Sequence, residues 1–487
     1  MRNQNLDFSP SEFARFNRRH VLRQLGSGLG GIALSSLLSD DASSQARGES
    51  KSRIFDVRTK PSEYEPKAKA IIQLFMHGGP SQVDLLDPKP MLTKYHGKQP
   101  PAEVADDEKR TAQLVQGAFP FRKCGKSGLE FADVMPYISE HADDIAVIRS
   151  LYGEHRNHEH SIWHMQTGLI ISGRPNIGSW VAYGLGTENQ NLPAYVALPD
   201  PRGLPVDGVR NWSNGWLPPV YQGTPFRING SPVLNLHPKS PRPRAIELAR
   251  MRLLSQLNER HKKQHPGELE LDARISSFEL AARMQLSATE ALDITKETAA
   301  TQRLYGLDND VTGTYGLQCL LARRLVERGV RIVQIFMSGQ PWDTHTENAS
   351  GMRKCCAQTD LPIGGLMTDL KRRGLLDSTL IWWGGEFGRT PAADNRNTSP
   401  GTEGRDHHPY GFSVWLAGGG IKGGQSYGAT DDFGYRAIEN RTKVSDLHAT
   451  ILHQMGLDHE ALTYRHNARD ERLTDVYDAS VIDPLVG

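Results

Sequence analysis

Three stretches in the second half of the chain carry side chains that could bind a metal ion. They are Trp342-Asp343-Thr344-His345, Gly384-Gly385-Glu386 and Asp406-His407-His408. The first two follow short apolar runs, residues 331–337 and 379–383, of the kind that form buried strands. Ligands of α/β proteins bind at the carboxyl ends of such strands. Carboxylates and imidazoles are donors for divalent metal ions, so these stretches predict a metal site.

Further histidines lie in the first half of the chain, where His158 opens a predicted helix that ends near Gly168. His160 and His164 are four residues apart and would share one face of this helix. Such a pair could bind a metal ion, but histidines that line a core or face water have the same spacing. The sequence leaves these alternatives open.

Strands and helices alternate along the chain from residue 70 onward. The predicted strands are residues 70–76, 145–149, 194–198, 331–337, 379–383 and 412–417. The predicted helices are residues 131–141, 158–167, 177–186, 314–328, 360–373 and 444–455. This alternation predicts an α/β fold with a mostly parallel sheet covered by helices on both faces. The segment that carries Asp406, His407 and His408 is predicted to be a loop.

Two long segments interrupt the alternation. Residues 199–243 are rich in Pro, Gly, Asn and Trp, and we expect them to form a long loop. Trp212 and Trp216 would either pin this loop or line a substrate site, and pinning is favoured. Residues 245–305 have a helical composition and predict a packed helical hairpin. The sequence does not decide whether this hairpin is a lid, a dimer surface or part of the core.

The amino terminus has the order of a secretion signal. Arg18 and Arg19 precede a weakly apolar, glycine-rich run at residues 24–38, and Ser44-Gln45-Ala46 offers a cleavage site. Paired arginines predict the twin-arginine route, although an ordinary amphipathic helix is the alternative. The apolar run is too short and too rich in glycine for a membrane span. We therefore expect a mature chain without a membrane span in the periplasm or outside the cell.

This interpretation divides the chain into three parts. Residues 1–46 would be the twin-arginine signal peptide, residues 47–67 an extended linker, and residues 68–487 a single α/β domain. A formal net charge of +1 over 487 residues argues against nucleic acid or an anionic membrane as the main partner. The four cysteines form no CxxC pair, so neither a zinc ribbon nor a disulfide framework is expected.

Several longer motifs are recognisable together: HGGPSQVDLLDPKP, GRPNIGSWVAYGLG, WDTH, GGEFGRTP, GRDHHPYGFSVWLAGGGIKGG and VSDLHATILHQMGLD. They cover nearly all of the mature chain and resemble one bacterial family of twin-arginine-exported proteins, the domain-of-unknown-function family 1501. The resemblance places the chain in the alkaline phosphatase/sulfatase superfamily. It implies an alkaline-phosphatase-like three-layer α/β/α sandwich with a metal site at the carboxyl ends of the strands. Members of that superfamily cleave phosphate or sulfate esters with one or two metal ions, and many use Thr, Ser or a modified Cys as nucleophile.

The site that this resemblance implies departs from the superfamily pattern at two positions. An Asp-His pair of metal ligands is replaced by Glu386 and Phe387, and a phenyl ring cannot bind a metal ion. The position of the nucleophile, counted back from Thr167 and Gly168, is occupied by His158, which has neither a hydroxyl nor a thiol group. Both departures argue against a standard phosphomonoesterase with two metal ions.

Other positions match the superfamily more closely. Asp343 and His345 resemble a pair of ligands, with a spacing of two residues instead of four, and His407 resembles a late histidine ligand. The first strand of the superfamily ends in an aspartate ligand. Here His77 holds the end of that strand and Asp84 follows seven residues later.

The resemblance thus implies one divalent ion, zinc, calcium or manganese, and the candidate ligands are Asp343, His345, Glu386 and His407, with His77 and Asp84 as further candidates. A water molecule on such an ion would lose a proton near neutral pH. His158 would be a general base, a further ligand or a nucleophile. Arg389 would clamp a phosphate or sulfate oxygen, or form an ion pair with Glu386 or Asp406. Asp406 and His408 are candidate substrate-binding residues.

Two functions follow from these expectations. The first is an exported metal-dependent hydrolase that acts on a phosphate or sulfate ester of a small molecule or polysaccharide. The second is a non-catalytic exported binding protein, suggested by the missing hydroxyl group at His158 and the missing imidazole at Phe387. Members of the family often accompany large secreted haem-domain proteins, so the resemblance also implies a partner of that kind in a surface complex.

Overall fold

The computed structural model describes residues 57–101, 112–229, 243–264, 290–394 and 401–487, together with residues 275, 279–280 and 283–284. The predicted signal peptide, residues 1–46, and the first part of the predicted linker lie outside the described residues. None of the helices within the described ranges is long and apolar enough to cross a membrane.

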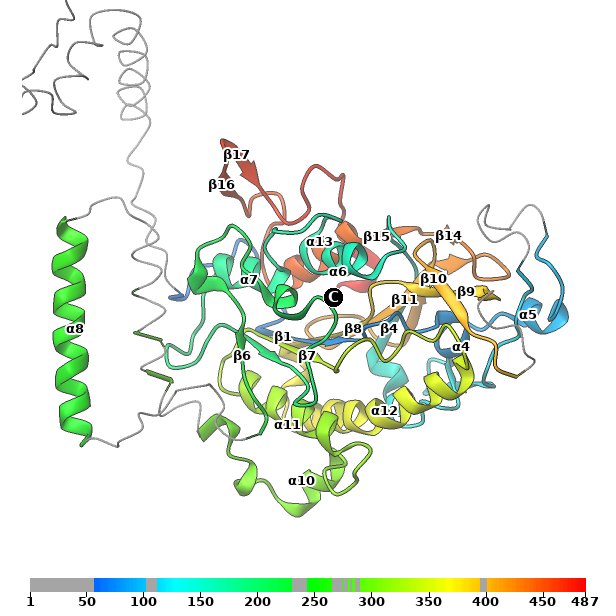
Figure 1. Cartoon of the computed structure of the whole chain (residues 1–487), viewed down its shortest axis with the longest axis horizontal. Coiled ribbons are helices and arrows are strands. Elements are labelled where there is room, and N and C mark those ends of the chain that lie inside the picture. The colour runs from blue at the N-terminus through cyan, green and yellow to red at the C-terminus, as the bar shows by residue number, and fades with distance from the viewer. Residues whose placement is uncertain are drawn as a thin grey trace, which may run out of the picture. The chain divides into compact units, whose positions relative to one another are not determined.

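A nine-stranded sheet carries the candidate site (Figure 1). Its strand order is β12-β4-β11-β8-β1-β7-β5-β6, and β15 also pairs with β4. The strands are β1 (Ala70–Phe75), β4 (Ile145–Tyr152), β5 (Tyr195–Leu198), β6 (Thr224–Pro225), β7 (Ile332–Phe336), β8 (Thr379–Gly384), β11 (Phe412–Ala417), β12 (Gln425–Tyr427) and β15 (Thr442–Lys443). All pairs are parallel except those of β11, which runs antiparallel to β4 and β8. The mostly parallel sheet predicted from the sequence is confirmed.

Helices cover both faces of this sheet, which makes a three-layer α/β/α sandwich (Figure 1). One face packs against α6 (His158–Thr167), α7 (Ile177–Leu185) and α13 (Val444–Gln454), and the other packs against α11 (Gly313–Val326) and α12 (Asn348–Arg372). Successive side chains of a strand point to opposite faces. In β8, Leu380 and Trp382 pack in the core on the side of α6, α7 and α13, whereas Ile381 and Trp383 pack in the core on the side of α11 and α12. Burial on both faces explains why the strands are continuous apolar runs.

The remaining elements are short, apart from α8 (Arg244–Gln264). They are α4 (Gln82–Leu85), α5 (Pro90–Lys94), β2 (Phe121–Cys124), β3 (Leu129–Ala132), α10 (Ala299–Leu304), β9 (Gly388–Ala393), β10 (Arg405–His408), β13 (Ala429–Thr430), β14 (Ala437–Glu439), β16 (Tyr464–His466) and β17 (Arg469–Glu471). The helix α8 falls in the segment 245–305, and the break predicted near residues 265–267 lies outside the described residues. Trp212 is buried against Phe336 with ring centroids 5.5 Å apart, so it pins the loop that follows β5.

Three predicted elements differ from the structure. Residues 131–141 were expected to form one helix, but they begin in β3, which pairs with β2, and end in a 3-10 helix at Ile138–Asp144. The helix expected at 360–373 begins at Asn348 and contains Pro362. Asp360 resembles a capping residue, but its carboxylate accepts hydrogen bonds from the backbone of Tyr137 and Ile138 instead.

The third difference concerns the segment predicted to be a loop around His407. It forms the strand β10, which pairs antiparallel with β9, and His407 lies opposite Arg389 in this pair. The segment after Glu386 therefore supplies a partner strand that the apolar pattern did not reveal. Because side chains alternate along β10, His407 and His408 point to opposite sides of it.

Candidate metal centre

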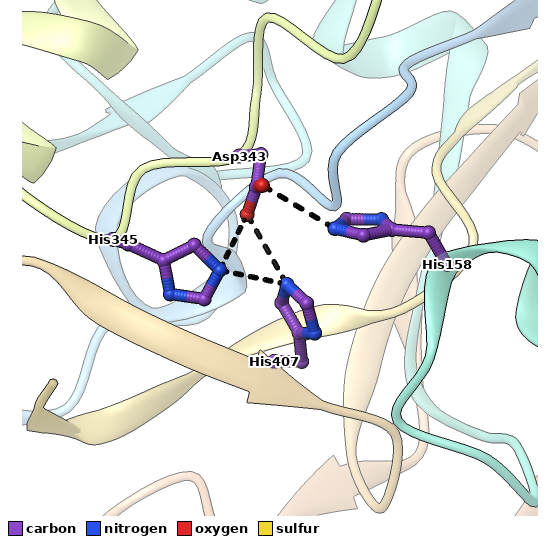
Figure 2. A group of neighbouring side chains, drawn as sticks. All are labelled: His158, Asp343, His345 and His407. Carbon is purple, nitrogen blue, oxygen red and sulfur yellow. Dashed lines mark hydrogen bonds and ion pairs between the residues drawn. The ribbon is translucent and has the colours of Figure 1, made fainter. Parts of the chain in front are cut away.

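Four side chains that could bind a metal ion converge at the carboxyl ends of the central strands (Figure 2). His158 is the first residue of α6, Asp343 and His345 lie in the segment between β7 and α12, and His407 lies on β10. One donor atom from each lies within 4.8 Å of the others. Each side chain keeps 11–16% of its surface exposed, so solvent reaches the group. The structure thus brings together His158, Asp343, His345 and His407 of the residues predicted from the sequence.

Three of these donors form a small triangle around one carboxylate oxygen. Asp343 Oδ1 lies 2.9 Å from His345 Nε2 and 3.2 Å from His407 Nε2, and the two nitrogens are 2.9 Å apart. A tetrahedral zinc ion with bonds of about 2.0–2.1 Å places its ligand atoms roughly 3.3 Å apart. The triangle is close to this size, and His158 Nε2 lies 3.4 Å from the other oxygen, Asp343 Oδ2.

Each of the three imidazoles is held from behind by an oxygen atom that accepts a hydrogen bond. The pairs are His158 Nδ1 with Glu386 Oε1 at 2.7 Å, His345 Nδ1 with Asp394 Oδ2 at 2.6 Å, and His407 Nδ1 with the Arg156 carbonyl oxygen at 2.8 Å. Carboxylates and carbonyls only accept, so each Nδ1 carries the proton and donates it. Each Nε2 then faces the group, which is how metal-binding histidines are commonly oriented.

Imidazole nitrogens without a proton repel the nearby carboxylate oxygens of Asp343 unless a positive charge lies between them. Although burial lowers it, hydrogen bonds to Asp343 and Glu386 raise the pKa of His158 to about 9. Burial raises the pKa of Asp343, but hydrogen bonds with the three histidines and the charge of Arg389 outweigh it and hold this pKa far below its usual range. The group therefore attracts a cation, either a proton or a metal ion, and its nitrogen and oxygen donors fit a divalent metal ion.

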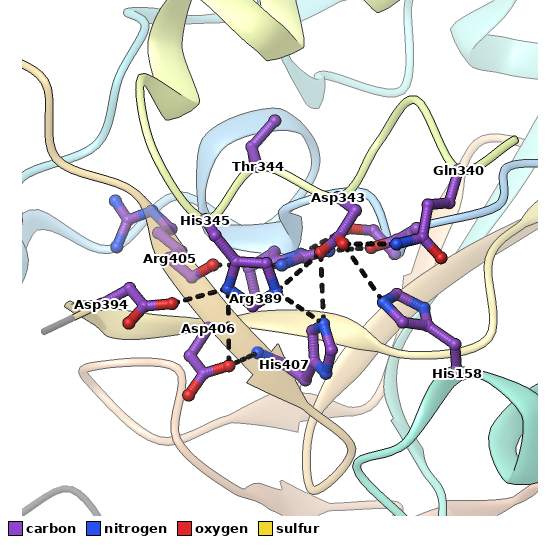
Figure 3. Close-up of polar contacts among 12 residues, drawn as sticks. His158, Gln340, Asp343, Thr344, His345, Arg389, Asp394, Arg405, Asp406 and His407 are labelled. Carbon is purple, nitrogen blue, oxygen red and sulfur yellow. Dashed lines mark hydrogen bonds and ion pairs between the residues drawn. The ribbon is translucent and has the colours of Figure 1, made fainter. Parts of the chain in front are cut away.

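Arg389 and Gln340 hold the carboxylate of Asp343 in place (Figure 3). Arg389 Nη2 donates to Asp343 Oδ1 at 2.6 Å, and Gln340 Nε2 donates to Asp343 Oδ2 at 2.7 Å. The guanidinium of Arg389 is fully buried and also donates to the carbonyl oxygens of Gly78, Gly79 and Arg405. Because its guanidinium group is used in these hydrogen bonds, Arg389 positions Asp343. This corrects its prediction as a substrate clamp or as the ion-pair partner of Glu386 or Asp406.

Glu386 lies behind His158 and outside the four-residue group. Its buried carboxylate accepts hydrogen bonds at Oε1 from His158 Nδ1 and from the backbone nitrogen of Gly78 at 2.8 Å. The prediction that Glu386 is a metal ligand is therefore replaced by a role in orienting His158. The adjacent Phe387 ring packs against His158 and His407, with centroids 5.0 and 4.6 Å away.

Asp84 is not brought to the group. Its fully buried carboxylate accepts two hydrogen bonds from Arg405, at 2.8 and 3.0 Å, and others from Asn348, Ser81 and the backbone of Ala118. This buried ion pair leaves no carboxylate oxygen to bind metal, which corrects the prediction for Asp84. His77 is also fully buried outside the group, with Nε2 3.0 Å from Asn211 Oδ1.

Asp406 and His408, which were predicted to bind substrate, lie outside the four-residue group. Asp406 Oδ1 lies 3.7 Å from His345 Nδ1 and forms a second carboxylate–imidazole group with His345 and Asp394. His408 is buried, and its Nε2 bonds to the Tyr435 carbonyl oxygen, so it does not face the group and cannot bind substrate there. His160 and His164 share no metal-binding group among the described residues: His160 stacks on His155, and burial lowers the pKa of His164 to about 4.

Several residues that shape the site have no recognisable signature in the sequence. Asp394, Gln340 and the carbonyl group of Arg156 reach it only through the pairing of β9 with β10 and the contacts of the segment after β7. Glycines make close approach possible: a Cβ atom on Gly78, whose φ is +110°, would clash with the backbone nitrogen of Asp343.

Comparisons with known proteins give a family match and matches to several solved structures. A search of curated proteins finds no match. Solved structures that match include the PsFucS1 sulfatase from Pseudoalteromonas sp., with 13% identity, a TM-score of 0.34 and coverage of 81% of this chain and 68% of that one. An alkaline phosphatase from the Antarctic bacterium TAB5 matches with 13% identity, a TM-score of 0.30 and coverage of 80% and 98%.

A phosphonate monoester hydrolase from Silicibacter pomeroyi matches with 12% identity, a TM-score of 0.33 and coverage of 72% and 71%. At TM-scores this low, the chemistry of the site has to be judged from its own residues. A family model matches residues 68–486, nearly all of the described domain. The chain therefore belongs to the family described as a protein of unknown function, DUF1501.

Proposed function

We propose that this chain is an exported, metal-dependent hydrolase of phosphate or sulfate esters. The observation that carries the proposal is the common orientation of three imidazoles. Their Nδ1 atoms are held by Glu386, Asp394 and the Arg156 carbonyl, which turns three Nε2 atoms toward Asp343. Three such orienting contacts around one carboxylate are what a metal centre requires.

The donor set favours a particular class of metal. Imidazole nitrogens suit zinc and other first-row transition metals, whereas calcium takes six to eight oxygen ligands. The triangle of Asp343, His345 and His407 supplies two nitrogens and one oxygen at a spacing close to that of tetrahedral zinc. Zinc is therefore the first expectation, manganese or iron the second, and calcium is disfavoured.

A metal ion bound here would acidify a water molecule and withdraw charge from an ester oxygen. The chain's own residues contribute orientation. Arg389 and Gln340 fix the two oxygens of Asp343, and Asp394 fixes His345. The choice of phosphate or sulfate esters is supported by the motifs that resemble the alkaline phosphatase/sulfatase superfamily and by the position of the group at the carboxyl ends of parallel strands.

The number of donors supports a second candidate function. If all four side chains bind the ion, a tetrahedral site has no open position, and such closed sites are structural. The chain would then be an exported binding protein that is stabilised by its metal, with a secreted haem-domain protein as the proposed partner.

Elemental analysis of the full chain without its signal peptide tests the proposal, with His345→Ala and His407→Ala beside the wild type. The expected result is about one equivalent of zinc or another transition metal in the wild type and little in either variant. A panel of aryl phosphate and sulfate esters should then show turnover that is lost with a chelator and restored by zinc but not by calcium. Folded wild-type protein that holds no metal, even after reconstitution, would refute the proposal.

A further inference from the structure

A small cavity lies at the same edge of the sheet as the metal group. It has a volume of about 230 Å³ and is lined by residues from the segments 199–204 and 227–229, which follow β5 and β6. The strand β5 pairs in parallel with β7 on one side and with β6 on the other, so the cavity lies one to two strands beyond β7. Neighbouring strands are about 4.8 Å apart, which places the cavity roughly 5–10 Å along the edge from the end of β7.

Backbone contacts join this cavity to the metal group. Leu204 lines the cavity, and its carbonyl oxygen accepts a hydrogen bond from the backbone nitrogen of Gly339 at 3.0 Å. The next residue, Gln340, donates its side-chain amide to Asp343 Oδ2 at 2.7 Å. Pro205 also pairs in parallel with Gly339, so the segment after β5 runs beside the segment after β7. The cavity wall and the carboxylate of the metal group therefore have fixed positions relative to each other.

The cavity offers mainly apolar surface. Both oxygens of Asp200 accept hydrogen bonds from the Arg202 guanidinium, from Nε at 2.9 Å and from Nη2 at 2.6 Å, so this lining carboxylate is already used within the protein. Leu204 is 53% exposed, which leaves a large apolar side chain in water beside the cavity. An apolar ligand would remove this surface from water at a gain in free energy. The apolar lining residues are Pro199, Pro201, Leu204 and Ile228.

The size of the cavity limits what it can hold. Pockets that enclose a complete drug-sized ligand have volumes of about 300–1,000 Å³. An apolar cavity of about 150 Å³ is large enough for one benzene molecule. A cavity of about 230 Å³ thus fits one compact ring system and suits one part of a larger substrate.

We propose that this cavity binds the alcohol part of the substrate, and that the substrate is a phosphate or sulfate ester whose alcohol carries one compact apolar ring system. The inference rests on the proposed hydrolase function. With the ester group at the metal group, a ring that is joined to phosphorus or sulfur through its oxygen or a short linker reaches the cavity along the sheet edge. Leu204 is then a specificity-determining residue that contacts the ring.

Equilibrium binding of 2-naphthol tests the cavity without any need for turnover. Fluorescence titrations use the full chain without its signal peptide, with and without zinc, as wild type, Leu204→Asp and Val209→Asp. Val209 is the matched control because it is 58% exposed and lies nearby in the same segment, but it does not line the cavity. We expect Leu204→Asp to bind 2-naphthol at least about tenfold more weakly than the wild type, because the ring would cover a carboxylate. Val209→Asp should bind it as the wild type does.

Turnover links the cavity to the substrate. The esters compared are 2-naphthyl phosphate and sulfate with methyl phosphate and sulfate, which share the reacting group and differ in the alcohol. Leu204→Asp should raise KM for the 2-naphthyl ester about tenfold and leave kcat unchanged, since a contact far from the reacting bond is equal in the ground state and the transition state. KM for the methyl ester should not change.

The possible contrary results separate the inference from the proposed function. Equal binding of 2-naphthol to the wild type and Leu204→Asp, or no binding to the wild type, would overturn the inference while the metal site stands. Weaker binding to Leu204→Asp without a higher KM for the 2-naphthyl ester would also overturn it, because the bound ring would not belong to the substrate. A wild-type chain that binds 2-naphthol but no zinc would instead refute the proposed hydrolase.

Discussion

At the residue scale, a side chain of the right type near the site is not enough to make it a ligand. Asp84 and Glu386 are carboxylates that follow the central strands β1 and β8. Both oxygens of Asp84 accept hydrogen bonds from Arg405, and Glu386 accepts hydrogen bonds from His158 and Gly78. The role of a carboxylate depends on the hydrogen bonds that it already makes to other protein groups. Residue type and spacing in the sequence do not reveal these hydrogen bonds. For this reason the sequence could nominate ligands here but could not rank them.

The role assigned to Asp84 can be tested by substitution. Asp84→Asn removes the negative charge that pairs with the buried guanidinium of Arg405, and breaking such a pair costs about 3–5 kcal/mol in the free energy of unfolding. Because Asp84 lies outside the metal group, the zinc content of the folded variant should equal that of the wild type. Urea denaturation and elemental analysis measure the two quantities. A variant with unchanged stability and no zinc would show that Asp84 binds the metal.

At the element scale, the central sheet could be predicted from the sequence, whereas the antiparallel pair of β9 and β10 at the site could not. Runs such as 379–383 are apolar on both faces because the sheet is buried on both, so periodicity found the central strands. The strand β9 (Gly388–Ala393) contains Arg389, Thr390 and Pro391, and β10 contains Arg405 and three titratable residues. Neither shows an apolar pattern, and the segment between them is too long for a tight hairpin turn that a sequence motif would reveal. Asp394, the residue that follows β9, was missed for the same reason.

The turn after β1 must carry a glycine where it meets the segment after β7. Gly78→Ala would place a Cβ atom against the backbone of Asp343 and Trp342 at a φ of +110°, so the loop that bears Asp343 should shift. We expect zinc affinity to fall by about tenfold or more, as when a supporting contact of a metal site is lost. Gly374→Ala is the matched control, because that glycine also has a positive φ of +65° but open space around it.

Gly374→Ala should cost about 1 kcal/mol of stability and leave zinc affinity unchanged. Isothermal titration of both variants with zinc provides the comparison. Equal affinities for the two alanine variants would mean that the close approach of Gly78 to Asp343 does not position the metal group.

The packing of α13 against α6 should be sensitive to acid. Burial lowers the pKa of His448 to about 4, and its Nε2 donates to the Met165 carbonyl of α6 at 2.9 Å. The unfolded chain protonates this histidine below its ordinary pKa of 6.5, whereas the folded chain resists protonation until about pH 4. Stability from this group is therefore fully present above pH 6.5 and is lost as the pH falls toward 4.

The change between pH 7 and pH 5 amounts to about 2 kcal/mol for this one group. His448→Gln keeps an amide donor for the Met165 carbonyl but does not titrate, so its free energy of unfolding should fall by about 2 kcal/mol less over the same range. Urea denaturation with a chelator present, at several pH values, separates this effect from metal binding. Parallel pH profiles for the two proteins would contradict the assignment.

At the scale of the whole molecule, the fold serves to gather distant segments. His158 comes from the first third of the chain and Asp343, His345 and His407 come from the last third, and the parallel strands β1, β7 and β8 end at the edge where they meet. The family match covers residues 68–486, and the motifs that resemble the family are spread over this range. Both observations agree with a site that depends on the entire domain. Any truncation that removes β10 or α6 would remove a member of the group.

The most direct test of the metal centre is a crystal structure of the zinc-loaded chain, with diffraction recorded on both sides of the zinc absorption edge. The anomalous map should show one strong peak, about 2.0–2.2 Å from His345 Nε2, His407 Nε2 and an Asp343 oxygen. His158 Nδ1 should remain hydrogen-bonded to Glu386. A map without a peak among these residues, or with its peak at Asp84 or Glu386, would contradict the account.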